Sequence, residues 1–363
     1  MNLDSTTIVI LLVVLARFVV PLLIPRFPLP AIIASLVLDA VDGTVLEVLT
    51  GSEPEGYQTY DKALDVFYLA IAYLSTIRNW RQMTAYRVSQ FLFYYRLIGV
   101  ATFELSGARW VLLVFPNTFE YFFIWYEALR TRWNPVKFAV AHILIAAAAI
   151  WIFIKLPQEW WIHVAQLDFT DEVKANPLLW TVLFVVGIAI LVPLAFRYKR
   201  YLGTPDWGLT FKVDTHLERR PDPGTPVVER VFTWALLEKV VLVGLVSIIF
   251  SQLLTLEASA LQIVVAVGTV VVVNALISSW LTRRGATWER VGVTFVVMSI
   301  VNFGVLVGYI LLRSSFEAEF DTGEIFFLVL VFTLIVTLFD HYRPLGARLV
   351  GRTEDPIEAR FKT

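Results

Sequence analysis

The sequence predicts an all-α, polytopic transmembrane protein with about eleven spans, and three observations carry this prediction. Of the 363 residues, 58% are hydrophobic and only 17% are charged, whereas soluble domains carry about 25% charged residues. The mean hydropathy is +0.70. Apolar stretches of about 20 residues, the length at which a helix crosses a bilayer, recur along the chain. Helices are expected because lipid offers no partner to unpaired backbone groups.

The predicted spans follow one another from the N-terminus to the C-terminus. They lie at about 6–24, 29–49, 61–77, 83–104, 108–128, 136–155, 177–197, 230–252, 258–280, 290–313 and 324–341. The first has no basic residue before it and no small-residue cleavage site after it, so it is expected to be a retained helix. The segment 29–49 is the weakest, because it carries three carboxylates, and both a full span and a broken one stay open.

A polar stretch at 198–229 divides the chain into two membrane blocks. Residues 1–197 form an N-terminal block of about seven spans, and 230–363 form a C-terminal block of about four spans with a short tail. Lys and Arg gather in alternate connections, and Asp and Glu gather in the others. Because basic connections stay inside, we expect a multi-pass cell-membrane protein with its N-terminus outside and its C-terminus, like the 198–229 loop, in the cytoplasm.

Composition excludes several kinds of site. The chain has no Cys, which excludes disulfides, thiolate metal sites and cysteine nucleophiles. The net charge is −1, so no nucleic-acid partner is expected. The expected partners are the lipid bilayer and a lipid substrate. The substrate's identity, the oligomeric state, partner subunits and the organism cannot be inferred from the sequence.

Ionisable residues inside spans are functional candidates, and here they gather between residues 39 and 127. Asp39 and Asp42 are three apart, and Asp61 and Asp65 are four apart, so each pair shares a helix face. Four converging carboxylates suit a hard divalent cation with oxygen ligands, here Mg²⁺ or Mn²⁺. Without a cation, the like charges would repel one another. The alternative is structural: Asp61 then serves as a helix N-cap or first-turn carboxylate.

This spacing resembles the CDP-alcohol phosphotransferase family over roughly residues 10–120. The family motif is D-x-x-D-G-x-x-A-R followed by G-x-x-x-D-x-x-x-D, and Gly43 stands at the first motif glycine. The chain departs from the motif at Leu46–Glu47, which replace A-R, and at Gly56, which lies one place early. The resemblance implies metal-dependent transfer of a phospho-alcohol group. The family's active site is cytoplasmic, whereas the charge pattern places Asp39–Asp65 near the outer face.

A second polar set lies on the next two spans. Asn117, Glu120 and Glu127 share one helix face, and we expect Glu120 to be buried against Arg87 or Arg96 of the preceding span. The candidate substrate-binding residues are Gly43, Arg87, Arg96 and Glu120, and Asp65 is the candidate catalytic base. A structural ion pair is the alternative. The adjacent Glu238 and Lys239 point about 100° apart on a helix, so they are not expected to pair with each other but to pack against residues of other helices.

Three functions stay open. The first is a divalent-metal-dependent membrane transferase that moves a phospho-alcohol group on a lipid or pyrophosphate-linked substrate, with the metal held by the four aspartates. The second is a transporter or channel that uses the polar set at residues 87–127. The third is a structural or accessory subunit without catalysis.

Overall fold

The computed structural model describes residues 5–50, 57–165, 169–213, 234–253, 293, 295–300 and 322–353. Within these ranges the regular structure is helical and contains no strand, as the sequence predicted. In chain order, the helices are α1 (Ser5–Val19), η1 (Val20–Leu23), α2 (Pro28–Thr50), α3 (Tyr57–Asn79), α4 (Met83–Ser106), α5 (Trp110–Val114), α6 (Thr118–Arg130), η2 (Pro135–Lys137), α7 (Val140–Ile150), η3 (Trp151–Lys155), α8 (Leu156–Glu159), η4 (Trp160–Ala165), α9 (Phe169–Ala175), α10 (Pro177–Leu202), α11 (Trp234–Leu253) and α14 (Thr322–Thr353).

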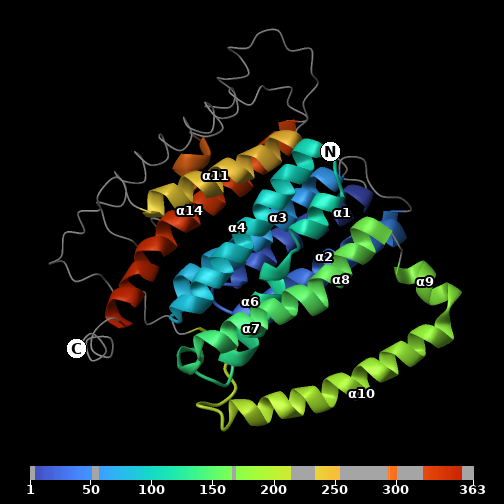
Figure 1. Ribbon diagram of the computed structural model, residues 1–363. Helices are drawn as coiled ribbons and strands as arrows, with labels where there is room; N and C mark the ends of the chain where they lie inside the picture. Colours follow the sequence, from blue (N-terminus) through green and yellow to red (C-terminus); the bar gives the residue numbers. More distant parts are fainter. Residues whose placement is uncertain are drawn as a thin grey trace.

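Helix α3 lies at the centre of the bundle (Figure 1). From Ala63 to Ile77 every side chain is buried except Asp65, which is partly exposed. A helix that is apolar on all faces is stable only when other helices surround it, and α3 packs against α1, α2, α4, α6, α11 and α14. Stacked aromatic rings fill these contacts, such as Tyr73 on Phe93 with ring centres 4.4 Å apart. The polar side chains near the C-terminal end of α3, Ser75, Thr76, Arg78 and Asn79, therefore lie inside the bundle.

The predicted span 108–128 is not continuous. It is divided into α5 and the 13-residue α6 by the non-helical residues Phe115–Asn117. Pro116 accounts for the break, because a proline restricts the residue before it to extended backbone. Pro116 and Asn117 are buried, so other parts of the protein enclose the irregular backbone of this break.

The segment from Val140 to Ala165 is one long helix with two π-helical turns, η3 and η4. The predicted span 136–155 ends before Glu159. Instead the helix continues, and Lys155 and Glu159 are buried within it. Inserted π turns are frequent at functional sites.

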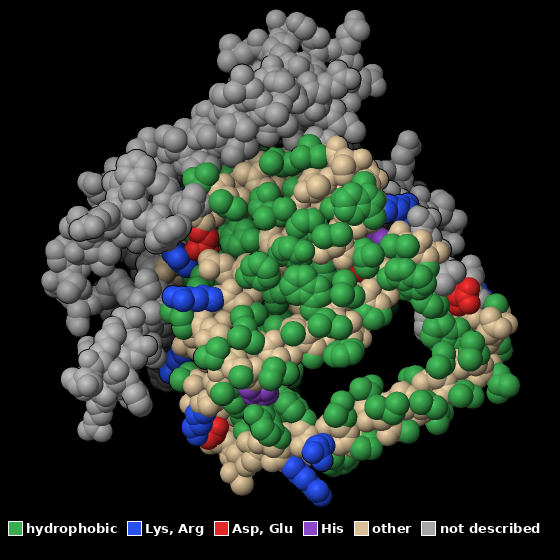
Figure 2. All heavy atoms as spheres, in the orientation of Figure 1, with side chains coloured by type: hydrophobic (Ala, Val, Ile, Leu, Met, Phe, Trp, Pro, Cys, Tyr) green, Lys and Arg blue, Asp and Glu red, His purple; other side chains and the backbone are tan. Residues whose placement is uncertain are grey.

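Within the part of the chain that the structure describes, two helices are both long and apolar enough to cross a membrane: Val140–Ala165 and Pro177–Leu202. Helix α10, which is the second of these, stands apart from the bundle and leaves an opening between itself and the body (Figure 2). The predicted span 29–49 is the single helix α2, which leaves the full-span alternative in place. The predicted spans 258–280 and most of 290–313 lie outside the described residues.

The C-terminal helices α11 and α14 pack side by side against α3, and α11 also packs against α4 (Figure 1). Glu238 and Lys239 pair with different residues of α14, as expected: Arg343 Nη2 lies 2.9 Å from Glu238 Oε2, and Lys239 Nζ lies 2.7 Å from Asp340 Oδ2. Tyr73 of α3 also donates a hydrogen bond to Glu238. The two predicted membrane blocks are thus in contact through buried polar groups.

Candidate functional site

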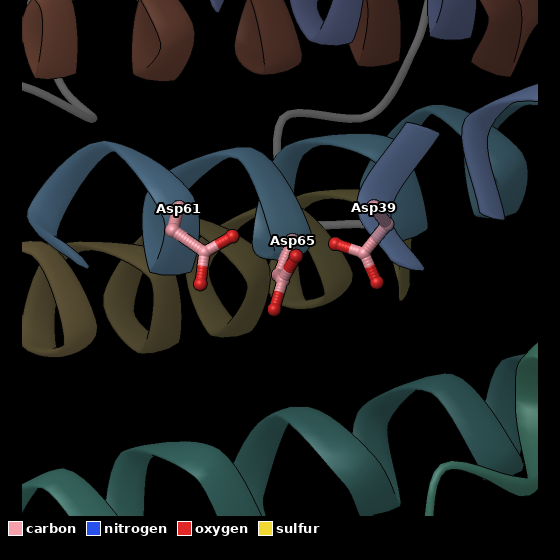
Figure 3. Close-up of side chains that lie close together, drawn as sticks. All are labelled: Asp39, Asp61 and Asp65. Carbon is pink, nitrogen blue, oxygen red and sulfur yellow. The ribbon is translucent and has the colours of Figure 1, made fainter. Parts of the chain in front are cut away.

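The structure brings the four predicted aspartates together. Asp39 and Asp42 share a face of α2, and Asp61 and Asp65 share a face of α3. Helices α2 and α3 pack against each other, so the two faces meet. One carboxylate oxygen from each of Asp39, Asp61 and Asp65 lies within 4.8 Å of the others (Figure 3).

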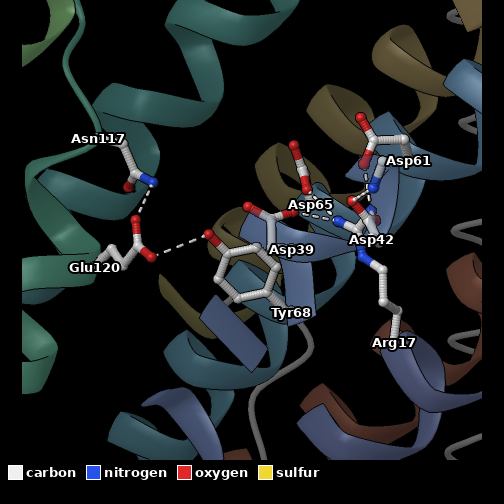
Figure 4. Close-up of polar contacts among 9 residues, drawn as sticks. Arg17, Asp39, Asp42, Asp61, Asp65, Tyr68, Asn117 and Glu120 are labelled. Carbon is white, nitrogen blue, oxygen red and sulfur yellow. Dashed lines mark hydrogen bonds and ion pairs between the residues drawn. The ribbon is translucent and has the colours of Figure 1, made fainter. Parts of the chain in front are cut away.

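Arg17 of α1 lies in the middle of the four carboxylates (Figure 4). Its Nη1 donates hydrogen bonds to Asp42 and Asp61. Its Nη2 donates to Asp39 and, at 2.7 Å, to Asp65. One positive charge therefore faces four negative charges, which leaves a net charge of −3 when all five groups are ionised. We call these five residues the aspartate cluster.

The aspartate cluster has a buried side and an open side. Exposure of the side chains is 3% for Arg17 and 8% for Asp42, against 31% for Asp39, 39% for Asp61 and 45% for Asp65. Asp42 is further held by the backbone N–H of Gly43, which donates to its Oδ1 at 2.6 Å. Arg17 and Asp42 thus form the floor of the site, and the three remaining carboxylates are open to a ligand.

The donor set fits a divalent cation. Mg²⁺ binds oxygen at about 2.0–2.1 Å and Ca²⁺ at about 2.3–2.6 Å, so two ligands on one ion are at most about 4.2 Å or 5.2 Å apart. The oxygens of Asp39, Asp61 and Asp65 lie within 4.8 Å of one another, which is close enough for all three to bind one Ca²⁺. Side-chain movements of a few tenths of an ångström would bring them close enough to bind Mg²⁺ or Mn²⁺. Arg17 contacts the same oxygens, so a cation and this guanidinium compete for them.

A second group of polar residues lies beside the aspartate cluster. Tyr68 follows Asp65 by one turn of α3, and its hydroxyl donates to Glu120 Oε1 at 3.2 Å (Figure 4). Asn117 Nδ2 donates to Glu120 Oε2 at 2.8 Å, and Lys155 Nζ lies 4.0 Å from that same oxygen. Glu120 is therefore held from α3, from the break before α6 and from η3.

The same group continues through Glu159 of α8. Its Oε1 accepts the backbone N–H of Asn117 at 3.0 Å and lies 3.8 Å from Arg96 Nη1. Its Oε2 lies 3.0 Å from His163 Nε2. We call Tyr68, Arg96, Asn117, Glu120, Lys155, Glu159 and His163 the Glu120 network. With two carboxylates facing Arg96 and Lys155, it has no excess of either charge while His163 is neutral.

Several expectations require correction. Glu120 is buried as predicted, but its cationic partner is Lys155 and not an Arg of α4. Arg96 pairs with Glu159 instead. Arg87 is exposed on α4 and makes no contact with either polar group among the residues the structure describes. Gly43 lies on the exposed face of α2 next to Asp42.

Sequence reasoning missed Arg17, Tyr68, Lys155 and Glu159. A signal for Arg17 was present, because it is the only charged residue between 6 and 24, and an ionisable residue within a span requires a partner. Lys155 and Glu159 carried a weaker signal, since their spacing of four places them on one helix face. No feature of the sequence around Tyr68 distinguished it from the aromatic residues that fill the core.

Comparison with known proteins adds no relative. No family model, no curated protein and no solved structure matches the chain. The resemblance of Asp39–Asp65 to the CDP-alcohol phosphotransferase motif thus rests on the residues themselves.

Proposed function

We propose that the chain is an integral membrane enzyme that transfers a phospho-alcohol group from a pyrophosphate-linked donor, such as a CDP-linked lipid, to an acceptor hydroxyl with the help of a divalent cation. The observation that carries the proposal is the convergence of Asp39, Asp61 and Asp65 from two adjacent helices. The open side of the aspartate cluster gives a substrate access to these carboxylates, and its excess negative charge favours a cation.

The multi-pass topology is part of this proposal. Helices α2, α3 and α4 have 23, 23 and 24 residues and α11 has 20, and about 20 residues at 1.5 Å each span the 30 Å hydrocarbon core. We propose about eleven spans with the N-terminus outside. Because the chain has no Cys, single introduced cysteines at 55 and at the partly exposed position 132 give a direct test. We expect labelling of 55 from outside and of 132 from the cytoplasm, and labelling of 55 only from the cytoplasm would contradict the topology.

Each residue of the aspartate cluster has a role in the proposed chemistry. A bound Mg²⁺ or Mn²⁺ supplies charge neutralisation for the donor's phosphate oxygens. Asp65, the most exposed of the four carboxylates, accepts the proton of the acceptor hydroxyl. The hydroxyl oxygen then forms a bond to phosphorus while the bond from phosphorus to the leaving phosphate breaks. Arg17 holds the carboxylates in register, because its two terminal nitrogens bind oxygens from both helices.

The cation site is tested by thermal unfolding of the purified protein in detergent. An ion that binds only the folded state raises stability, so the melting temperature of the parent should increase when Mn²⁺ or Mg²⁺ replaces EDTA. Asp39→Asn should remove this increase without unfolding the protein, since it deletes one ligand charge and also relieves repulsion. Asp206→Asn, a matched change at a carboxylate outside the cluster, should leave it intact. Equal cation responses in the parent and Asp39→Asn would contradict the cation site.

The transfer reaction needs a separate measurement. Incubation with Mn²⁺, CDP-diacylglycerol and a set of acceptor alcohols should release CMP, and Asp65→Asn should abolish the release. Cation-dependent stabilisation without CMP release from any CDP-linked donor would refute the transferase and retain the cation site.

A second candidate function, transport, is favoured by one observation. The break between α5 and α6 carries Asn117 and leads directly to Glu120, and interrupted helices at membrane depth are typical of transporter binding sites. Cation-driven flux into liposomes containing the protein, lost in Glu120→Gln, would support transport. The transferase proposal expects no such flux.

A further inference from the structure

Helix α10 is held to the rest of the protein only near its two ends, among the described residues. Near its C-terminal end, Tyr198 accepts a hydrogen bond from Trp125 Nε1 at 3.2 Å, and its hydroxyl lies 2.8 Å from His142 Nε2. Near its other end, the ring of Trp180 meets that of Trp161 edge-on at 5.6 Å. No residue in the most apolar 18-residue stretch of α10 is buried.

The opening between α10 and the body has apolar walls. Figure 2 shows hydrophobic side chains along both of its edges. On α10, Leu183, Val186 and Ile190 are exposed, and on the facing helix Ile152 and Phe153 are exposed. An exposed apolar surface of this extent is typical of a surface that contacts a membrane or another molecule.

The charged residues of α10 are all basic and lie at one end. Arg197, Lys199 and Arg200 are exposed in its last two turns, and the helix has no acidic residue. Near the opposite end lie Trp180 of α10 and Trp160 and Trp161 of η4, aromatic residues of the kind found where lipid meets water. The surface is therefore apolar along a bilayer-sized length and positive where a headgroup would lie.

We propose that the opening between α10 and α7–η3 binds an anionic phospholipid, with its acyl chains between the helices and its phosphate at Arg197 and Arg200. Charge complementarity distinguishes this occupant from a second copy of the chain. Copies in one membrane are related by an axis along the membrane normal, so a symmetric contact through this face keeps both basic turns at the same depth. Six like charges would then gather at the contact, whereas an anionic headgroup brings the opposite charge to the three basic residues of one copy.

Lipid retention by purified protein tests the site. The parent should retain about one anionic phospholipid per chain in mild detergent, detected by native mass spectrometry. Each Lys or Arg near a headgroup contributes about fivefold in affinity, so Arg197→Gln/Arg200→Gln should bind phosphatidylglycerol about 30-fold more weakly. Arg81→Gln/Arg87→Gln removes the same charge from two exposed arginines, one just before α4 and one on it, and should bind the lipid like the parent.

Two results would overturn the proposal. The first is equal retention of phosphatidylglycerol by the two double variants, which would mean that the basic end of α10 does not select the lipid. The second is efficient disulfide formation between copies of Val186→Cys in native membranes, which would mean that a second chain covers α10. Neither result bears on the cation site, because α10 contributes no residue to the aspartate cluster.

Discussion

Replacement of Arg17 by Met tests whether the guanidinium holds the aspartate cluster together. Met keeps much of the apolar side-chain volume and removes the charge that faces four carboxylates. Removing one partner of a buried ion pair costs about 3–5 kcal/mol, and the pair with Asp42 is buried on both sides. The other three carboxylates are about a third or more exposed, so their pairs contribute about 0–1 kcal/mol each after solvent screening. The expected loss is about 4 kcal/mol.

The free energy of unfolding is measured by SDS titration of the protein in detergent and EDTA, with the fluorescence of its 12 Trp as the signal. Arg26→Met is the matched control: this arginine is exposed nine residues further along the chain, and its loss should change stability by less than about 0.5 kcal/mol. The double variant Arg17→Met/Asp42→Asn should recover part of the loss, because the uncompensated buried charge is gone.

Divalent cations extend the same test. If a cation and Arg17 compete for the same oxygens, Arg17→Met should gain more stability from Mn²⁺ than the parent does. At a free concentration about 100 times its dissociation constant, the ion contributes about 2.7 kcal/mol, most of what Arg17→Met loses. The reasoning is refuted if Arg17→Met is as stable as Arg26→Met, or if Mn²⁺ stabilises the parent and Arg17→Met equally.

Two further predictions concern packing and pH. Gly99→Ala should lower the free energy of unfolding by about 1–3 kcal/mol, because a Cβ at this position would overlap Phe115 Cβ and lie 2.7 Å from its Cγ. Gly244→Ala is the control, because a Cβ there meets nothing within 4 Å. Equal melting temperatures of Gly99→Ala and Gly244→Ala would contradict this packing. A hydrogen bond from Lys137 holds the pKa of the exposed Asp206 carboxyl below its ordinary value of 3.8. A carboxyl whose pKa is lowered by folding stabilises the folded state when the pH is above the pKa of the unfolded chain, and this stabilisation is lost as the pH falls. Pepsin should therefore cut the 203–213 loop faster in Asp206→Asn than in the parent at about pH 5, and the two rates should converge at about pH 2; a constant ratio of the rates would contradict this.

The helices were predictable because long apolar runs dominate the sequence, but their interruptions were not. Pro116 separates α5 from α6, whereas Pro157 lies within the continuous helix from Val140 to Ala165 and Pro193 lies within α10. A proline lacks the backbone N–H donor and disfavours a helical conformation of the residue before it. Where neighbouring helices or π turns provide partners for the backbone carbonyl groups that this leaves unpaired, the helix continues, and elsewhere it ends. Tertiary surroundings therefore decide whether a proline ends a span.

The aspartates were predictable from local spacing, and their partners were not. Offsets of three and four fix which residues share a face of one helix, so each Asp pair was accessible from the sequence. The contact with Arg17 depends on how α1 packs against α2 and α3, and no periodicity within one helix contains that information. The same reason explains why Glu120 was predicted to meet α4 and in fact meets Lys155.

The balance of charge separates the two polar groups of the bundle. In the Glu120 network, Arg96 and Lys155 face Glu120 and Glu159, so the carboxylates there already have cationic partners. In the aspartate cluster a single guanidinium faces four carboxylates, three of them open. An uncompensated charge at membrane depth is costly, and its natural compensation is a bound cation or the positive end of a ligand. Among the described residues, only the aspartate cluster has this excess of negative charge. Experiments on cation and substrate binding should therefore target the aspartate cluster. Equivalent substitutions in the Glu120 network serve as controls.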